Sequence, residues 1–168
     1  MIYRALYIHE FTFKLPSRIP KAEKYLILYS SPDRLQNTSQ KLRYFRYKNG
    51  MLAKEVASYL GMSRKNYSYY EECSKEYCPL TMLESLAELY KIPVTELLDD
   101  YHLFLYNGQG NAVLQYRKSL HLTQKELAEK LYFDKTTIRC WEKEYHRMSR
   151  ETYENIFVKR IIERVSSI

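Results

Sequence analysis

Side chains that can recognise base pairs occur in two short segments of this sequence. The first holds Arg64, Lys65 and Asn66, and the second, residues 135–137, reads Lys-Thr-Thr. Arginine pairs with guanine and asparagine with adenine through two hydrogen bonds each, which is worth about 1–3 kcal/mol of discrimination. Lysine and threonine suit contacts with phosphate, base edges and the thymine methyl group. In another setting the same residues would form an ordinary solvated helix face.

The sequence offers little for other kinds of chemistry. Cys73 and Cys78 have no second pair at the spacing of a zinc site, and the four histidines are scattered. Cys140 has no base near it in the sequence, and we expect an inert thiol. No glycine-rich phosphate loop and no Ser-His-Asp arrangement is present. We therefore predict no enzyme, metal, cofactor or small-molecule ligand; an enzyme acting on DNA would need its site within residues 1–39.

One stretch of the sequence occurs twice, at an offset of 71 residues and without a gap. A repeat at a fixed offset indicates a structural unit that is present twice. Its apolar positions are expected in the core, whereas its charged positions could be functional or could form surface and intradomain ion pairs. The identical positions are Arg46 and Arg117, Lys54 and Lys125, Glu55 and Glu126, Ala57 and Ala128, Leu60 and Leu131, and Glu71 and Glu142.

The apolar residues of both copies follow the period of helices. In the first copy, Thr38 or Ser39 could cap a first helix, and Ser63 could cap the third, over residues 64–71. In the second copy, Thr123 is expected to cap a helix at residues 124–131, Asp134 one at 135–142, and a fourth starts near Ser149. The remaining expected helices lie around residues 56–60, 83–90, 95–98 and 113–117, and a fifth helix of the second copy is expected to be short or missing.

The second and third helices of each copy are expected to cross closely. Ala57 and Ala128 supply the small residue that such a crossing requires. A helix that enters the major groove also needs apolar anchors on its hidden side. The expected anchors are Tyr67 and Tyr70 in the first copy, and Ile138 and Trp141 in the second.

These residues carry a resemblance to a known family. Residues 122–128 read Leu-Thr-Gln-Lys-Glu-Leu-Ala and are followed by Leu131, Ile138 and Trp141-Glu142; this pattern resembles the Cro and phage-repressor (XRE-type) helix-turn-helix family. The first copy is similar through residues 49–51, 54–57, 60–63 and 70–71. The resemblance implies a mainly α protein with two tandem lambda-repressor-like helix-turn-helix bundles. It also implies a cytoplasmic transcriptional regulator of bacterial or phage origin that binds double-stranded DNA.

The two copies depart from this family pattern in different places. Thr123 and Gln124 match its phosphate-binding start of helix two, but the first copy has Leu52 and Ala53 there. In the second copy, the family's turn glycine is replaced by Tyr132. The DNA-binding residues that the resemblance implies are Ser63, Arg64, Lys65, Asn66, Tyr69, Thr123, Gln124, Lys135, Thr136, Thr137, Arg139 and Cys140.

Residues 1–38 differ in composition from the rest of the chain. Residues 2–13 and 25–29 are rich in β-branched and aromatic side chains, with a Pro-bearing loop between them, so we expect a short β-hairpin-like segment. An isolated hairpin is marginal in water, so this segment should pack on the helical body or form a homodimer with a second copy. The expected domains are residues 1–38, 39–99 and 111–168, with a connector at 100–110.

The overall composition agrees with a nucleic-acid partner. The net charge of +7 favours polyanions, the three cysteines suit a reducing compartment, and no apolar run is long enough to span a membrane. The 18 tyrosines could reflect a codon bias or contacts with a partner. The leading interpretation is a sequence-specific regulator that reads the major groove with both units. The alternative is a protein-interaction or antitoxin-like accessory module in which only one repeat binds DNA.

Overall fold

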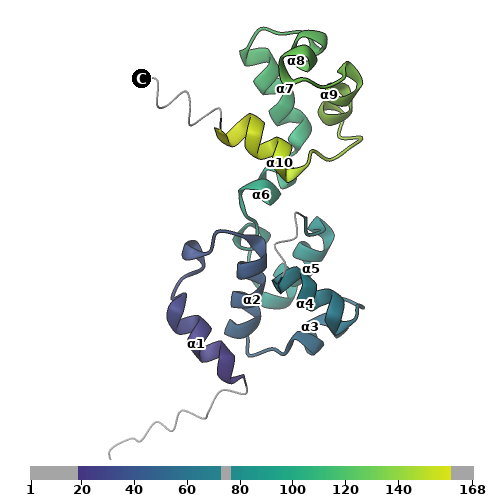
Figure 1. The fold of residues 1–168 in the computed structure, drawn as a ribbon. Coiled ribbons are helices and arrows are strands. Elements are labelled where there is room, and N and C mark those ends of the chain that lie inside the picture. The colour runs from purple at the N-terminus through teal and green to yellow at the C-terminus, as the bar shows by residue number, and fades with distance from the viewer. Residues whose placement is uncertain (1–18, 73–76, 160–168) are drawn as a thin grey trace, which may run out of the picture.

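The computed structural model describes residues 19–72 and 77–159, and all regular elements in these ranges are helical. This confirms the mainly α prediction. Figure 1 shows two groups of helices, one above the other, with α6 between them. The α-helices are α1 (Pro20–Leu28), α2 (Thr38–Lys48), α3 (Ala53–Tyr59), α4 (Arg64–Glu72), α5 (Leu80–Tyr90), α6 (Asp100–Tyr106), α7 (Gln109–Ser119), α8 (Gln124–Leu131), α9 (Lys135–Glu142) and α10 (Arg150–Tyr153). Short 3-10 turns cover Pro32–Arg34 and Val94–Glu96, and a π-helical turn, Glu154–Val158, continues α10.

The first group has its core between α2, α3, α4 and α5. Val56 and Ala57 of α3 and Tyr67 of α4 are buried against the apolar faces of α2 and α5. Leu97 and Leu98, which follow the Val94–Glu96 turn, also belong to this core. The second group repeats the arrangement with α7, α8, α9 and α10, and its core contains Val113, Leu127, Ala128, Ile138, Trp141, Met148 and Ile156.

The predicted strand at residues 25–29 is wrong, because this segment lies in helix α1 and its C-cap. Pro20 occupies the first turn, where its fixed φ and missing N–H favour a helix. Tyr25 then packs on α2, and its hydroxyl donates a hydrogen bond to the carbonyl of Gln40 at 3.2 Å. The apolar run thus serves a helix that lies along α2, as Figure 1 shows. The other expected strand, residues 2–13, lies outside the described residues.

Two of the four expected N-caps form the expected hydrogen bond, those of α4 and α8. Ser63 Oγ accepts from the backbone N–H of Asn66, and Thr123 Oγ1 accepts from that of Glu126. For α2, however, the cap is Asn37, whose side chain accepts from the N–H of Gln40 at 2.9 Å. Thr38 and Ser39 lie inside α2 and are buried, because their side chains face the protein interior. Asp134 occupies the N-cap position of α9 but its side chain forms no capping hydrogen bond.

The segment between the two groups is helical. Within the expected connector at residues 100–110, only Asn107 and Gly108 interrupt the helices, and α7 begins at Gln109. Gly110 lies where α7 passes the end of α9: a Cβ atom there would stand 2.6 Å from the carbonyl oxygen of Glu142. The absence of a side chain at Gly110 therefore allows the close contact between these helices.

The same left-handed turn joins α3 to α4 in the first group and α8 to α9 in the second. Gly61 has φ +65° and Tyr132, 71 residues later, has φ +60°. The N–H of the next residue donates back to the carbonyl of Ala57 in one turn and of Ala128 in the other, both at 2.9 Å. Tyr132 therefore keeps the turn geometry of a glycine, although a left-handed conformation costs a non-glycine residue about 1–2 kcal/mol.

Candidate nucleic-acid interface

An arginine–glutamate pair fixes α4 in the first group, and an equivalent pair fixes α9 in the second; these are called the third helices below. Arg46 Nε lies 2.6 Å from Glu71 Oε1, and Arg117 Nε lies 2.6 Å from Glu142 Oε1. In both pairs the arginine Nη1 also donates to the carbonyl five residues further along the chain, at 3.0 and 2.9 Å. These identical charges are therefore ion pairs within each group. They bind α4 to α2 and α9 to α7, and so set the angle of each third helix.

The electrostatics of the two pairs favour the ionised forms. Burial by itself would raise the pKa of Glu142, but hydrogen bonds from Arg117 and Gln124 outweigh burial and lower the pKa. Burial would likewise lower the pKa of Arg46, but the hydrogen bond to Glu71 outweighs it and raises the pKa. Removing one partner of the Arg46–Glu71 pair would leave a buried unpaired charge, which costs about 3–5 kcal/mol.

The repeated glutamates of the second helices also have a structural role. Glu55 Oε2 accepts from the N–H of Leu52 at 2.8 Å, and Glu126 Oε2 accepts from that of Thr123 at 2.7 Å. In the second group Thr123 completes a capping box with Glu126. In the first group the side chain of Leu52 cannot accept a hydrogen bond, so only the bond to Glu55 is formed.

The outward faces of α4 and α9 carry most of the predicted DNA-binding residues. With Tyr67 and Glu71 buried on one side of α4, the first turn and Tyr69 face solvent. With Ile138 and Trp141 buried on α9, its polar residues lie on the opposite side. The exposed members of the predicted set are Ser63, Arg64, Lys65, Asn66, Tyr69, Thr123, Lys135, Thr136 and Arg139, whereas Gln124, Thr137 and Cys140 are half-buried.

Some of these residues are already engaged within the protein. Ser63 and Thr123 cap helices, as described above. Gln124 Nε2 donates to Glu142 Oε2 at 2.7 Å, so its amide is held over the end of the Arg117–Glu142 pair. Sequence reasoning assigned Gln124 to phosphate or a base edge and did not find this partner, which lies 18 residues away. This hydrogen bond fixes the orientation of the side-chain amide of Gln124. Within the described residues, its side-chain oxygen accepts no hydrogen bond.

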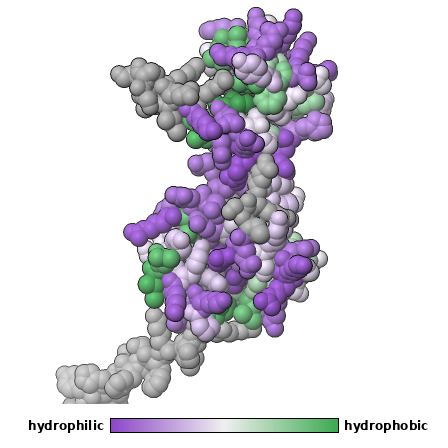
Figure 2. Space-filling view, in the orientation of Figure 1, coloured by the Kyte–Doolittle hydropathy of each residue, from purple (hydrophilic) through white to green (hydrophobic). Residues whose placement is uncertain are grey.

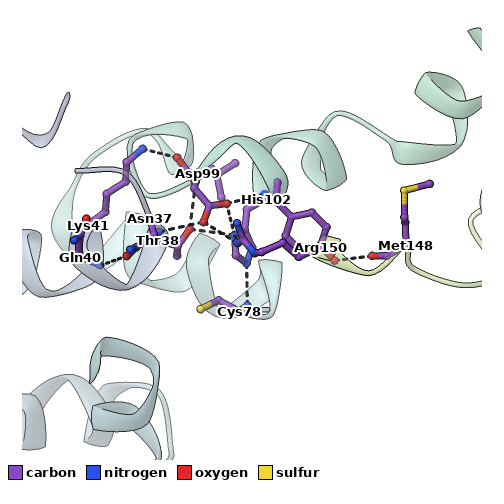
Figure 3. A network of polar contacts seen from close by, with 11 residues as sticks. Asn37, Thr38, Gln40, Lys41, Cys78, Asp99, His102, Met148 and Arg150 are labelled. Carbon is purple, nitrogen blue, oxygen red and sulfur yellow. Dashed lines mark hydrogen bonds and ion pairs between the residues drawn. The ribbon is translucent and has the colours of Figure 1, made fainter. Parts of the chain in front are cut away.

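A buried polar network joins the two groups, and sequence reasoning did not find it (Figure 3). Asp99 Oδ1 accepts from the backbone N–H and the ring Nδ1 of His102, at 3.0 and 2.7 Å. Its other oxygen accepts from the N–H of Thr38 and from Arg150 Nη2, at 3.3 and 2.8 Å. His102 Nε2 accepts from the N–H of Cys78 at 2.9 Å, which assigns the ring proton to Nδ1. One carboxylate thus connects α2, α6 and α10.

The charge of Asp99 is compensated on all sides. Burial would raise its pKa, but the hydrogen bonds from His102 and Arg150 outweigh burial and hold the pKa well below its ordinary value. Tyr101 adds a further link, because its hydroxyl donates to the carbonyl of Met148 at 2.6 Å. The guanidinium of Arg147 lies 3.5 Å from the ring centre of Tyr77. These contacts join α2, α6 and Tyr77 to the segment of residues 147–150.

The visible surface is mostly hydrophilic, with apolar exceptions on both groups (Figure 2). On α1, Ile27 and Leu28 are 81% and 66% exposed. On the second group, Tyr132 is 95% exposed at the turn before α9, and the ring of Phe133 packs against Trp141 with centroids 5.0 Å apart. Sequence reasoning treated Tyr132 only as a departure from the family turn, although it is the most exposed aromatic side chain of the described residues.

Neither a metal site nor a membrane span is found in the described ranges. Among the residues that the structure describes, no group of three or more His, Cys, Asp or Glu side chains could hold a metal ion. Within the same ranges, no helix combines the length and apolarity of a membrane span. No family model, curated protein or solved structure matches this chain.

Proposed function

We propose that this protein binds double-stranded DNA in a sequence-specific manner and regulates transcription, with α3–α4 and α8–α9 as two helix-turn-helix units. The observation that carries the proposal is the pair of equivalent third helices. Each has an exposed polar first turn, and each is fixed from behind by the same arginine–glutamate pair. A rigid helix with a solvent-facing polar turn is what insertion into the major groove requires.

The two units differ in what they offer to DNA. The first turn of α4 presents Lys65 and Asn66, and asparagine favours adenine. The α9 helix presents Lys135, Thr136 and Arg139, which suit phosphates and base edges. Two unequal units predict an operator with two different half-sites. Because they are joined in one chain, the second binding event is intramolecular and raises the avidity.

The test is selection from a random duplex pool, followed by band-shift titration of the selected and a scrambled duplex at two salt concentrations. We expect a selected sequence with two unlike half-sites and a preference over the scrambled duplex that persists at the higher salt. Binding that shows no sequence preference at either concentration would refute the proposal, since phosphate contacts alone are sequence-independent.

A second candidate function rests on α1. Its exposed Ile27 and Leu28 support a protein-interaction module, in which one unit binds DNA and α1 associates with a second copy or another protein. Sedimentation equilibrium of the wild type and of the Ile27→Ser/Leu28→Ser double variant tests it. A wild-type dimer that the double variant converts to a monomer supports this function, and a monomeric wild type argues against self-association.

A further inference from the structure

A cavity lies on the first unit where α1 meets α3 and α4. It has a volume of about 420 Å³. Three exposed cations from three different helices line it: Lys21 of α1, Lys54 of α3 and Arg64 of α4. None of the three forms an ion pair with a carboxylate of the described residues. The cavity also borders Arg46 and Glu71, which neutralise each other, and the carboxylate of Glu72.

This cavity occupies a corner at which the two units differ. Leu52 and Ala53 line it, and their counterparts at the 71-residue offset are Thr123 and Gln124. At these two positions the second unit therefore has a hydroxyl and an amide, whereas the first unit has two apolar side chains. In the first unit the polar groups of the cavity are supplied by neighbouring positions, and one of them, Lys21, comes from α1.

Among the described residues, no helix equivalent to α1 stands at the 71-residue offset. The residues 71 positions after Pro20–Leu28 are 91–99, which belong to the end of the first group and not to a helix beside α7. Lys21 is thus a cation that only the first unit possesses. Its helix is held in place by the packing of Tyr25 and Tyr29 on the core, so the position of Lys21 depends on the fold and not on a free chain end.

We infer that this cavity binds a backbone phosphate of duplex DNA through Lys21, Lys54 and Arg64. The inference rests on the proposed function and deepens it, because it assigns α1 to the DNA-binding surface. A phosphodiester carries one negative charge, and three uncompensated cations against one further carboxylate favour it. Arg64 then serves as a phosphate contact and not as the guanine reader that the sequence suggested. Base recognition by α4 is left to Lys65, Asn66 and Tyr69.

The experiment compares Lys21→Ala with Lys24→Ala in the full chain. Both lysines are exposed on α1, but only Lys21 lines the cavity, so the two variants remove the same charge from the same helix. Binding to the selected duplex and to a scrambled duplex is measured by fluorescence anisotropy over a series of salt concentrations. For Lys21→Ala we expect about eightfold weaker binding at 0.1 M salt on both duplexes, and a salt slope smaller by about 0.9, as for one lost phosphate contact.

Lys24→Ala is expected to stay within about twofold of the wild type, since a charge outside the contact acts only through the screened field. Lys21→Arg should restore binding and Lys21→Gln should not, which separates charge from packing. Equal effects of Lys21→Ala and Lys24→Ala, with a wild type that binds DNA, would overturn this inference and leave the proposed function intact. A wild type that binds neither duplex would overturn both.

Discussion

At the residue scale, Asn66 is the side chain on which base discrimination by the first unit should depend most. It is exposed in the first turn of α4, and its backbone N–H is held by Ser63 Oγ. We predict that Asn66→Ala weakens binding to the selected duplex by about 1–3 kcal/mol and relaxes the preference at one base pair. Binding to the scrambled duplex and the salt slope should not change, which titration of both duplexes would measure.

Ser68→Ala is a suitable control for Asn66→Ala, because Ser68 lies on the same helix but is half-buried beside the Arg46–Glu71 pair. It should leave the base preference unchanged. If Asn66→Ala weakened binding to the selected and the scrambled duplex equally, Asn66 would instead contact the DNA backbone.

Asp99 should make the protein sensitive to acid. Its folded-state pKa lies well below that of an unfolded aspartate, about 3.9, so its ionised form stabilises the fold above that pH. The contribution falls as the pH drops below about 4 toward the folded-state pKa. We predict that the difference in unfolding free energy between wild type and Asp99→Asn narrows by about 1 kcal/mol from pH 5 to pH 3. Urea unfolding at both values measures it, and a constant difference would contradict the prediction.

At the element scale, the turn between α8 and α9 stores conformational strain. Tyr132 has φ +60° and is 95% exposed, so its side chain contributes little packing to offset the strain. We predict that Tyr132→Gly stabilises the protein by about 0.5–1 kcal/mol, which is less than the full left-handed penalty because glycine loses more entropy on folding. Thermal unfolding should show a rise of about 1–4 °C.

The equivalent turn of the first unit provides the reciprocal variant. Gly61 has φ +65°, and a Cβ atom there would meet no other atom within 4 Å. Gly61→Ala should therefore destabilise the protein by about 1 kcal/mol through backbone strain alone. If both substitutions moved the unfolding temperature in the same direction, the strain of the left-handed turn would not be the cause.

Local signals were sufficient to predict the elements that form the two helix pairs. The expected helix at residues 64–71 is one residue short of α4, and those at 124–131 and 135–142 coincide with α8 and α9. Periodic apolar residues and nearby caps decide these helices. The segment 25–29 was mistaken for a strand because its apolar residues give no helical period by themselves. Pro20 at the start of the helix and the contact of Tyr25 with α2 favour its helical conformation.

The candidate site was predictable only in part, for a related reason. Exposure of Arg64, Lys65 and Asn66 follows from the period of α4, and the sequence predicted it. The cavity beside Lys21 and the bond of Gln124 to Glu142 arise from elements that are distant in the sequence. Such contacts depend on how helices pack, and no single segment of the sequence contains that information.

At the scale of the whole molecule, the network around Asp99 determines how the two units act together. It connects α2 and α6 to α10 through buried hydrogen bonds, and Arg150 is its contact from the second group. If both units bind DNA, this rigid connection fixes the distance and the rotation between the two half-sites. The protein should therefore tolerate only one spacing on the operator.

We predict that inserting five base pairs between the half-sites, about half a helical turn, removes most of the avidity of the wild type. Arg150→Ala should make binding less dependent on the insertion, because the second group loses its contact with Asp99. Band-shift titration of both duplexes with both proteins measures this. Arg147→Ala removes the other arginine of this junction, which contacts the Tyr77 ring and not the carboxylate, and it should relax the dependence on the insertion less than Arg150→Ala does.

The duplicated arginine–glutamate pairs have a consequence for how this chain can change. Neither Arg46 nor Glu71 can be replaced alone without leaving a buried charge, so this pair resists any single substitution. The corner at residues 52–53 and 123–124 and the turn at 61 and 132 differ between the copies, and there each copy has contacts of its own, such as the hydrogen bond of Gln124 to Glu142. The two copies thus keep the arginine and the glutamate together because each of these side chains needs the other.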